Sequence, residues 1–286
     1  MMGWKQRAFF VMGLSLLIAI LVWSQMGIYL AHALFGVNLQ VNFFKFCISL
    51  FREGSFYYFL IIIVLNTLIV YTVLITLIKT AQQYFLLGRF RKKILSLRNT
   101  ELTGILNQEF ERENEDIMVI NHKQLLAFTV GFRRPYIVLS SSLIEILEDH
   151  ELKAVVEHET FHQKNYDSLK VFVLLLISQT LWYIPLTKWS YQNYKIISEL
   201  LADEYAIQRM GSELSLGSTL LKLVKNCFSE NSTPILVHFS DGSVNYRLQQ
   251  LVDPKKTIPV RMEARLIVIS VYILILLMSM IMLAVT

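Results

Sequence analysis

The sequence predicts an integral membrane protein that is mainly α-helical, with a domain of helices and a small β-sheet placed between transmembrane helices. The first observation is that three apolar runs without charges each approach the ~20 residues that a helix needs to cross a hydrocarbon core. The second is composition, since 54% of the 286 residues are hydrophobic and 17% are charged, against roughly 45–50% and 25% in ordinary soluble domains. This composition excludes a disordered chain, a collagen-like repeat and a disulfide scaffold.

The three apolar runs are the predicted membrane-spanning helices. The predicted helices cover about residues 8–28, 54–78 and 264–286, and the uncharged part of the third is Leu266–Val285. They divide the chain into an N-terminal membrane region (1–79), a central domain (80–263) and a C-terminal span. A buried helix of a soluble protein is the less favoured alternative, because soluble helices are seldom apolar on every face. For the first run a cleaved signal peptide is also an alternative, since residues 31–33 have the small-x-small form of a cleavage site.

Basic residues flank these runs unevenly and predict the orientation in the membrane. The flanking residues are Lys5, Arg7, Lys79, Arg89, Arg91, Lys92, Lys93, Arg98, Lys255, Lys256, Arg261 and Arg265. By the positive-inside rule, the N-terminus and residues 80–263 are cytoplasmic and the C-terminus lies outside, in a multi-pass protein of the cell membrane. The net charge of 27 − 22 = +5 is then explained mostly by the basic residues that set the orientation in the membrane. The lipid bilayer is therefore an expected partner, and direct nucleic-acid binding is not expected.

The central domain begins with a polar, helix-prone connector over residues 80–115. Short apolar stretches bounded by turn residues then predict the strands of a small sheet, at Ile117–Ile120, Leu125–Val130 and Tyr136–Leu139. Ser142 and Glu145 have the spacing of a capping box and predict a helix start. A second helix is predicted from about Asp149 to Tyr166.

That second helix carries an H-E-x-x-H pattern at residues 158–162. Residues four apart on a helix share one face, so the imidazoles of His158 and His162 can converge on one zinc ion. Glu159 is offset by one residue, where it can reach a metal-held water instead of the metal. The alternative is a pair of surface histidines with no metal. With only Cys47 and Cys227 in the chain, a Cys-rich zinc site is excluded.

A catalytic zinc site needs a third protein ligand and an open position. Glu199 and Asp203 lie four residues apart, again on one helix face, whereas Glu204 lies on another face. Glu199 could bind the zinc, and Asp203 could hold a ligating histidine through its other ring nitrogen. A Glu-x-x-x-Asp pair alone usually lies on a solvent-exposed helix face. It indicates a metal site only because the same chain also carries the H-E-x-x-H pattern.

The apolar run Val171–Thr187 could be taken for a further span. One complete crossing would place Glu199 on the opposite side of the membrane from His158, which a shared metal forbids. We therefore predict a buried or membrane-dipping helix over 171–187, with Trp182 near the interface and Pro185 at its end. Asp167 follows His162 by five residues, about 140° around a continuous helix, so a structural role is favoured over metal binding.

Three segments together resemble the BlaR/MecR family of membrane-embedded zinc metallopeptidases. They are AFTVGFRRPYIVLSSSLIEILEDHELKAVVEHETFHQKNYDSLK, LWYIPL and ELLADEYA, within a resemblance that covers residues 80–286. The resemblance implies a gluzincin arrangement, in which Glu199 is the third zinc ligand, and a protease domain on the cytoplasmic side between spans. It also implies regulatory proteolysis that ends with the loss of a cytoplasmic transcriptional repressor, which would be the protein partner.

Two departures limit what the resemblance implies. Members carry a penicillin-binding sensor domain after the last span, which these 286 residues do not include, so β-lactam sensing is not expected to carry over. Members also usually have one more span before the protease than the two predicted here. Peptide-bond hydrolysis is still expected, with Zn²⁺ as the cofactor.

The expected protein is thus a membrane zinc endopeptidase that acts on a protein or peptide substrate. Glu159 would take the proton of the zinc-held water and pass it to the leaving amine. An extended substrate could add to the sheet edge around Leu125–Val130. Arg247 is a candidate for contact with the oxyanion or substrate, and the alternative for it is a surface salt bridge. The rival functions are a housekeeping protease similar to the HtpX/CaaX-protease family and a non-catalytic signalling protein with a vestigial site.

Overall fold

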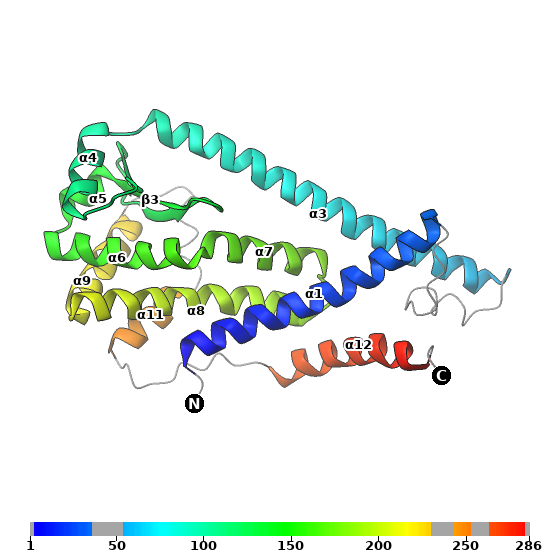
Figure 1. Cartoon of the computed structure of the whole chain (residues 1–286). Coiled ribbons are helices and arrows are strands. Elements are labelled where there is room, and N and C mark those ends of the chain that lie inside the picture. The colour runs from blue at the N-terminus through cyan, green and yellow to red at the C-terminus, as the bar shows by residue number, and fades with distance from the viewer. Residues whose placement is uncertain (1–2, 36–53, 230–242, 253–262, 284–286) are drawn as a thin grey trace. The chain divides into compact units, whose positions relative to one another are not determined.

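The computed structural model describes residues 3–35, 54–229, 243–252 and 263–283 of the chain (Figure 1). The chain divides into two compact units. Unit 1 comprises Met1–Ala8, Tyr84–Phe172 and Asn193–Val260, and unit 2 comprises Phe9–Gln83, Val173–Gln192 and Arg261–Thr286. Unit 1 holds the sheet and the H-E-x-x-H helix, and unit 2 holds the apolar helices.

Among the described residues, two helices are long and apolar enough to cross a membrane. They are α1 (Trp4–Phe35), apolar over Trp4–Ile28, and α3 (Phe56–Ser96). Large apolar side chains on both are exposed, such as Phe9 and Ile63, as expected of helices that face lipid. At 41 residues α3 would be about 61 Å long, twice the ~30 Å of a hydrocarbon core. The helix therefore continues well past the predicted span 54–78, into the basic stretch.

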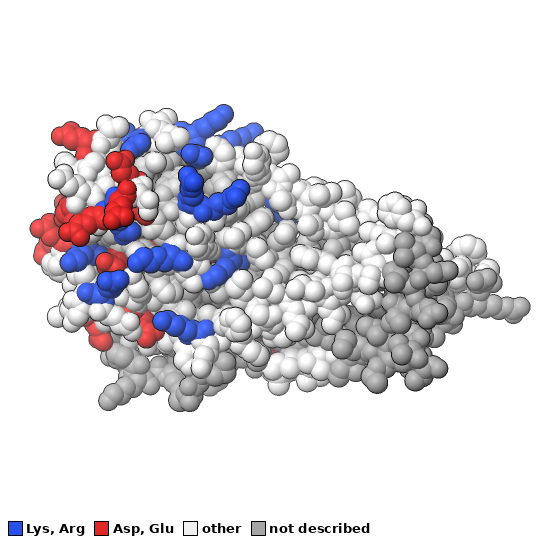
Figure 2. Space-filling view, viewed as in Figure 1, with Lys and Arg blue, Asp and Glu red and all other residues white. Residues whose placement is uncertain are grey.

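The described residues of unit 2 carry few charges, namely Lys79, Lys188, Glu263 and Arg265. In the view of Figure 2 the Lys, Arg, Asp and Glu side chains gather on one part of the described surface. The predicted third span coincides with α12 (Ala264–Leu283). The predicted outer segment falls largely on residues 36–53, outside the described residues. The domain boundaries and the orientation in the membrane stay predictions.

The predicted single helix over 171–187 is wrong. Helix α7 (Asp167–Thr180) ends earlier, and α8 (Pro185–Met210) begins at the proline that was expected to terminate it. Proline suits the first position of a helix, where its missing N–H is not needed. Because α7 would be about 21 Å long, it is too short to cross a ~30 Å core. The chain turns at residues 181–184. The start of α7 then lies close to α8, because the Tyr194 hydroxyl donates to Asp167 at 2.8 Å.

The sheet of unit 1 has three strands in the order β1-β3-β2. β1 (Ile117–Ile120) runs parallel to β3 (Tyr136–Ser140), and β2 (Ala127–Val130) runs antiparallel to β3. The three predicted strands are confirmed with bounds shifted by two residues at most. In this sheet β2 is an edge strand, and no other described strand pairs with it on the side away from β3.

The two faces of the sheet pack against different helices. On one face, Ile117, Val119, Ile137 and Leu139 pack with apolar side chains of α4 (Thr100–Glu109), α5 (Ser141–Ile146), α6 (Asp149–Asn165) and α9 (Glu213–Ser229). On the other face, Val138 and Phe128 pack against the end of α3 through Ile94. This alternation is the period-two pattern of a strand with both faces covered. Unit 1 also contains α11 (Ser243–Val252).

The caps of α5 and α6 set where the H-E-x-x-H helix begins. The expected cap at Ser142 is wrong, because Ser140 caps α5 by accepting a hydrogen bond from the Leu143 N–H. Ser140 ends β3, so the helix starts directly from the strand. The predicted second helix is confirmed as α6, which begins after Glu148, whose N–H donates to Glu151 at 3.0 Å.

Candidate metal centre

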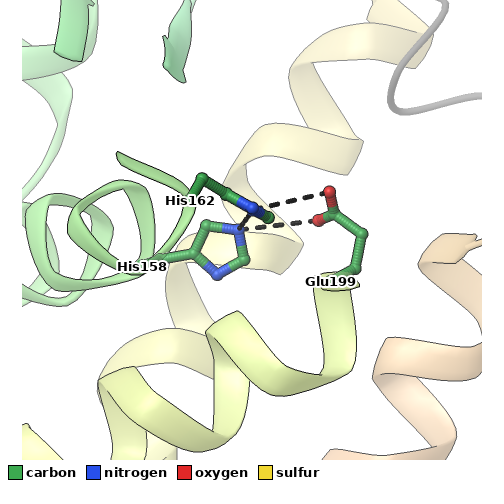
Figure 3. Close-up of side chains that lie close together, drawn as sticks. All are labelled: His158, His162 and Glu199. Atoms are coloured by element: carbon green, nitrogen blue, oxygen red, sulfur yellow. Dashed lines mark hydrogen bonds and ion pairs between the residues drawn. The ribbon is translucent and has the colours of Figure 1, made fainter. Parts of the chain in front are cut away.

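His158 and His162 project from one face of α6 into the interior of unit 1, where both side chains are buried (Figure 3). Their Nε2 atoms lie 3.2 Å apart. The four-residue spacing on a helix makes this convergence possible, as the sequence indicated. Two imidazole nitrogens are thus aimed at one point.

Glu199 of α8 supplies a carboxylate at the same point (Figure 3). Its oxygens lie 3.5 Å from His158 Nε2 and 3.6 Å from His162 Nε2. Ligand atoms about 2.0–2.1 Å from a tetrahedral zinc ion are separated by about 3.3–3.4 Å. The three spacings of 3.2, 3.5 and 3.6 Å fit that geometry, and the partial exposure of Glu199 leaves one side open.

Each histidine has a carboxylate behind it. His162 Nδ1 lies 2.8 Å from Asp167 Oδ2 in a hydrogen bond. His158 Nδ1 lies 2.9 Å from Asp203 Oδ1, a contact of charged groups in which the N–H is poorly aligned. A carboxylate at Nδ1 keeps the proton on that nitrogen and leaves the Nε2 lone pair for a metal. Two Nε2 lone pairs facing one another across 3.2 Å fit a bound cation.

A break between helices places Asp167. Tyr166 ends α6 in the left-handed conformation at φ 54°, and Asp167 then starts α7. Because the helix does not continue through Tyr166, Asp167 is not 140° away from His162 but returns to its ring. The Asp167 carboxylate also accepts hydrogen bonds from the Tyr194 hydroxyl at 2.8 Å and the Asn165 amide at 2.7 Å.

Arg247 of α11 joins the site from a distant part of the sequence. Its Nε and Nη2 donate to Asp203 at 2.8 and 2.7 Å, and its Nη1 lies 3.1 Å from Glu199 Oε2. The residue is only 7% exposed, so the surface salt bridge considered for it is wrong. Arg247 therefore holds Asp203 and Glu199, the two carboxylates of α8 that belong to the site. Glu204, also on α8, is exposed and pairs with Gln208.

These contacts shift the ionisation of the site. Burial and Arg247 would lower the pKa of His158, but Asp203 and Glu199 outweigh them and raise it to about 9. Burial would raise the pKa of Glu199, but contacts with His158, His162 and Arg247 lower it well below the ordinary value. Without a metal, His158 is therefore protonated at neutral pH, and a zinc ion must displace that proton to bind.

Glu159 lies beside this cluster and takes part in a different contact. Its side chain is buried, and Oε2 lies 2.9 Å from the hydroxyl of Thr129 on β2. The same hydroxyl lies 3.0 Å from the Glu159 carbonyl oxygen. Glu159 is not one of the three groups that could hold the metal, which fits the role of a base acting on a metal-held water.

The structure therefore brings together every residue singled out for the site, namely His158, Glu159, His162, Glu199, Asp203 and Arg247. Sequence reasoning missed Tyr194 and Thr129 and gave Asp167 only a general structural role. The residue type of Tyr166 does not predict its left-handed conformation, which brings Asp167, the partner of Tyr194, to the site. Thr129 lies in a strand whose sequence has no feature that points to catalysis.

One family model, two curated relatives and one solved structure are similar to this chain. The family described as BlaR1 peptidase M56 matches residues 56–251. The chain is 25% identical over 180 residues to the regulatory protein BlaR1 of Bacillus licheniformis, which covers 61% of this chain and 29% of that protein. It is 29% identical over 140 residues to a protease HtpX homolog of Helicobacter acinonychis (strain Sheeba), 45% of each. The crystal structure of S. mikatae Ste24p matches with a TM-score of 0.38 and 19% identity, over 79% of this chain and 64% of that one. The matched regions span less than half the length of both curated relatives.

Proposed function

Since the chain belongs to the BlaR1 peptidase M56 family of membrane peptidases, we propose that it is a zinc metalloendopeptidase with a gluzincin arrangement of ligands. His158, His162 and Glu199 hold the Zn²⁺, Glu159 is the general base, and Asp203 orients His158. The observation that carries the proposal is the spacing of 3.2, 3.5 and 3.6 Å between the three ligand atoms, next to a glutamate on the same helix.

The residues of the site then divide the work of peptide hydrolysis. When bound, the zinc ion would polarise the scissile carbonyl and acidify a water. Glu159 accepts the proton of that water and passes it to the leaving amine. Among the described residues, Oε2 of Glu159 is engaged by Thr129 and Oε1 has no side-chain donor, so Oε1 is the oxygen that takes the proton.

The free edge of β2 is the proposed place for an extended substrate. The Ser140 N–H donates to the Leu126 carbonyl at 2.9 Å, so these two residues form a hydrogen-bonded pair. Such pairs alternate along an antiparallel ladder, and the N–H and C=O groups of Ala127 and Thr129 therefore point away from β3. The Thr129 carbonyl already accepts a hydrogen bond from the Ser168 hydroxyl at 3.0 Å, so a peptide strand could pair with the Thr129 N–H and with the main chain of Ala127.

Arg247 remains the candidate for contact with the oxyanion or substrate. Its Nε is engaged by Asp203, but each of its Nη atoms carries a second N–H beyond the contacts described above. Its main part is to hold Asp203 and Glu199 in place.

The test uses the full-length protein in detergent, with fluorescein-labelled casein as substrate. We expect about one zinc per chain, and cleavage that stops when zinc is chelated. Glu159→Gln should keep the zinc and lose cleavage, because Glu159 is a base and not a ligand. Casein cleavage by zinc-loaded Glu159→Gln at the wild-type rate would contradict the mechanism.

The proposed setting is regulatory proteolysis at the cell membrane. We propose a cytoplasmic N-terminus and protease domain and an external C-terminus, with a cytoplasmic transcriptional repressor as the substrate. The match to the regulatory protein BlaR1 supports this setting. Cysteine labelling in intact cells should reach a site near Lys45 and not one near Asn231.

The match to a protease HtpX homolog favours a second candidate, a housekeeping membrane protease. The two functions differ in what a Glu159→Gln strain should change. Loss of regulatory cleavage leaves one set of genes repressed, whereas loss of housekeeping cleavage lets damaged membrane proteins accumulate. If the zinc-loaded wild-type protein cleaves nothing and the strain is unaffected, the remaining alternative is a vestigial site in a signalling protein.

A further inference from the structure

Thr129 is the residue where the substrate edge and the catalytic helix meet. It lies on β2 opposite Ile137, on the side of the strand that faces α6. Its hydroxyl lies 2.9 Å from Glu159 Oε2 and 3.0 Å from the Glu159 carbonyl oxygen. The hydroxyl has one proton, and an ionised carboxylate is the stronger acceptor, so the proton goes to Oε2.

The main chain of Thr129 is fixed as well. The Ser168 hydroxyl, at the start of α7, donates to the Thr129 carbonyl oxygen at 3.0 Å. That carbonyl points away from β3, as the pairing of Leu126 with Ser140 requires. Thr129 is thus tied to α6 through its side chain and to α7 through its main chain, which leaves its hydroxyl little freedom of position.

We propose that Thr129 is the positioning residue for the Glu159 carboxylate. The proposal rests on the function proposed above. By occupying Oε2, the hydroxyl directs the other oxygen toward the metal centre and keeps the carboxylate from turning away. A peptide strand paired with β2 contacts the main chain of the same residue, so substrate binding and the orientation of the base share one anchor.

Two variants separate this role from general packing. Thr129→Val keeps the shape and removes the hydroxyl, and Thr129→Ser keeps the hydroxyl and removes a methyl group. For Thr129→Val we expect casein cleavage to fall about 10- to 100-fold in kcat, the size of effect when a hydrogen bond to a charged group is lost. KM, zinc content and the thermal midpoint should stay close to wild type. Thr129→Ser should recover most of kcat.

Thr219→Val is the matched control. Thr219 is more deeply buried than the half-buried Thr129, and its hydroxyl donates to the Ser215 carbonyl of its own helix at 2.7 Å. We expect its kcat to stay within about twofold of wild type, because this bond lies within one helix and involves none of the residues proposed for catalysis or zinc binding. A fall as large as that of Thr129→Val would point to a general packing effect and overturn the proposal.

The outcomes distinguish this proposal from the proposed function. If wild type cleaves casein and Glu159→Gln does not, the function stands, and an unchanged kcat in Thr129→Val overturns only the role of Thr129. A loss of zinc in Thr129→Val, or a Thr129→Ser variant as slow as Thr129→Val, also overturns it. If Thr129→Val does not fold, Thr129→Ala replaces it, with a slow alanine variant and an active serine variant as the expected result.

Discussion

The two histidines of the metal centre are supported by carboxylates in the same way, but the carboxylates themselves are held differently. Behind His158, Asp203 accepts two hydrogen bonds from the guanidinium of Arg247. Behind the second histidine, the carboxylate accepts from a tyrosine hydroxyl and an asparagine amide. We name these the ionic arm (Asp203 and Arg247) and the neutral arm (Asp167, Tyr194 and Asn165).

Because the two arms hold their carboxylates differently, removing them should have different effects on stability and zinc binding. The ionic arm is shared, because Arg247 also contacts Glu199 at 3.1 Å, so its loss leaves two buried carboxylates without their cation. The neutral arm belongs to one histidine, and two donors serve one oxygen of Asp167. We infer that the ionic arm supports both folding and zinc binding. The neutral arm supports zinc binding, and each of its two donors can be removed with a smaller loss of zinc affinity.

The largest effect is expected for Arg247→Met, which removes the cation and keeps much of the apolar stem. Breaking a buried ion pair by removing one partner costs about 3–5 kcal/mol, so the variant should unfold at a much lower temperature and hold little zinc. Arg133→Met, at an exposed arginine in the turn between β2 and β3, is the control and should change stability by less than about 0.5 kcal/mol. Thermal unfolding in detergent and zinc content decide the comparison, and equal midpoints for the two variants would contradict the ionic arm.

The second prediction compares the two carboxylates directly through Asp203→Asn and Asp167→Asn. Loss of a group that orients a ligating histidine typically costs about 10- to 100-fold in metal affinity. Both variants should fall in this range, but only Asp203→Asn should also lower the thermal midpoint of the zinc-free protein, since it leaves Arg247 buried with a weaker partner. Zinc titration against a chelator and unfolding in EDTA measure the two effects. If Asp203→Asn in EDTA unfolds at the wild-type temperature, the ionic arm does not support folding and its assignment is wrong.

The parts of the fold and site that the sequence predicts are those set by local patterns. Short apolar stretches bounded by turn residues located the strands, and helical spacing brought His158 and His162 onto one face of α6. The same spacing placed Glu199 and Asp203 together on α8. Each of these patterns needs only the geometry of one element.

The parts that sequence reasoning missed depend on a backbone choice or on tertiary contact. Tyr166 in the left-handed conformation redirects Asp167 to His162, and nothing in the residue type requires that break. Pro185 begins α8, and the proline alone does not distinguish a helix start from a helix stop, since its ring suits the first position of a helix and also interrupts a helix interior. Arg247 was placed among the site candidates without its partners, because its 44-residue separation from Asp203 leaves no local signal.

The third prediction concerns pH and uses the ionic arm. In the zinc-free protein the pKa of His158 is raised from 6.5 to about 9. A raised pKa in the folded state adds stability below pH 6.5, and this stability is lost as pH rises through 9. Zinc needs the neutral imidazole, so its affinity should change in the opposite direction and rise over the same interval.

The measurement is the thermal midpoint with zinc and with EDTA at several pH values. The difference between the two midpoints should grow from pH 6.5 to pH 9 in the wild type. In Asp203→Asn the pKa of His158 loses one cause of its rise, so the growth should be smaller. A difference that shrinks with pH would show that His158 is not protonated in the zinc-free protein.

The smallest effect is expected for Tyr194→Phe in the neutral arm. Tyr194 is 2% exposed, and its hydroxyl donates to Asp167 Oδ1 at 2.8 Å. Phenylalanine fills the same space, and the Asn165 amide still donates to that oxygen at 2.7 Å. The loss should therefore be about 1 kcal/mol or less, or about fivefold in zinc affinity, well below that of Asp167→Asn. In the double variant with Asp167→Asn the tyrosine effect should largely disappear, because its partner is already weakened. If Tyr194→Phe instead costs as much zinc affinity as Asp167→Asn, the two donors are not interchangeable and the hydroxyl alone holds Asp167 in place.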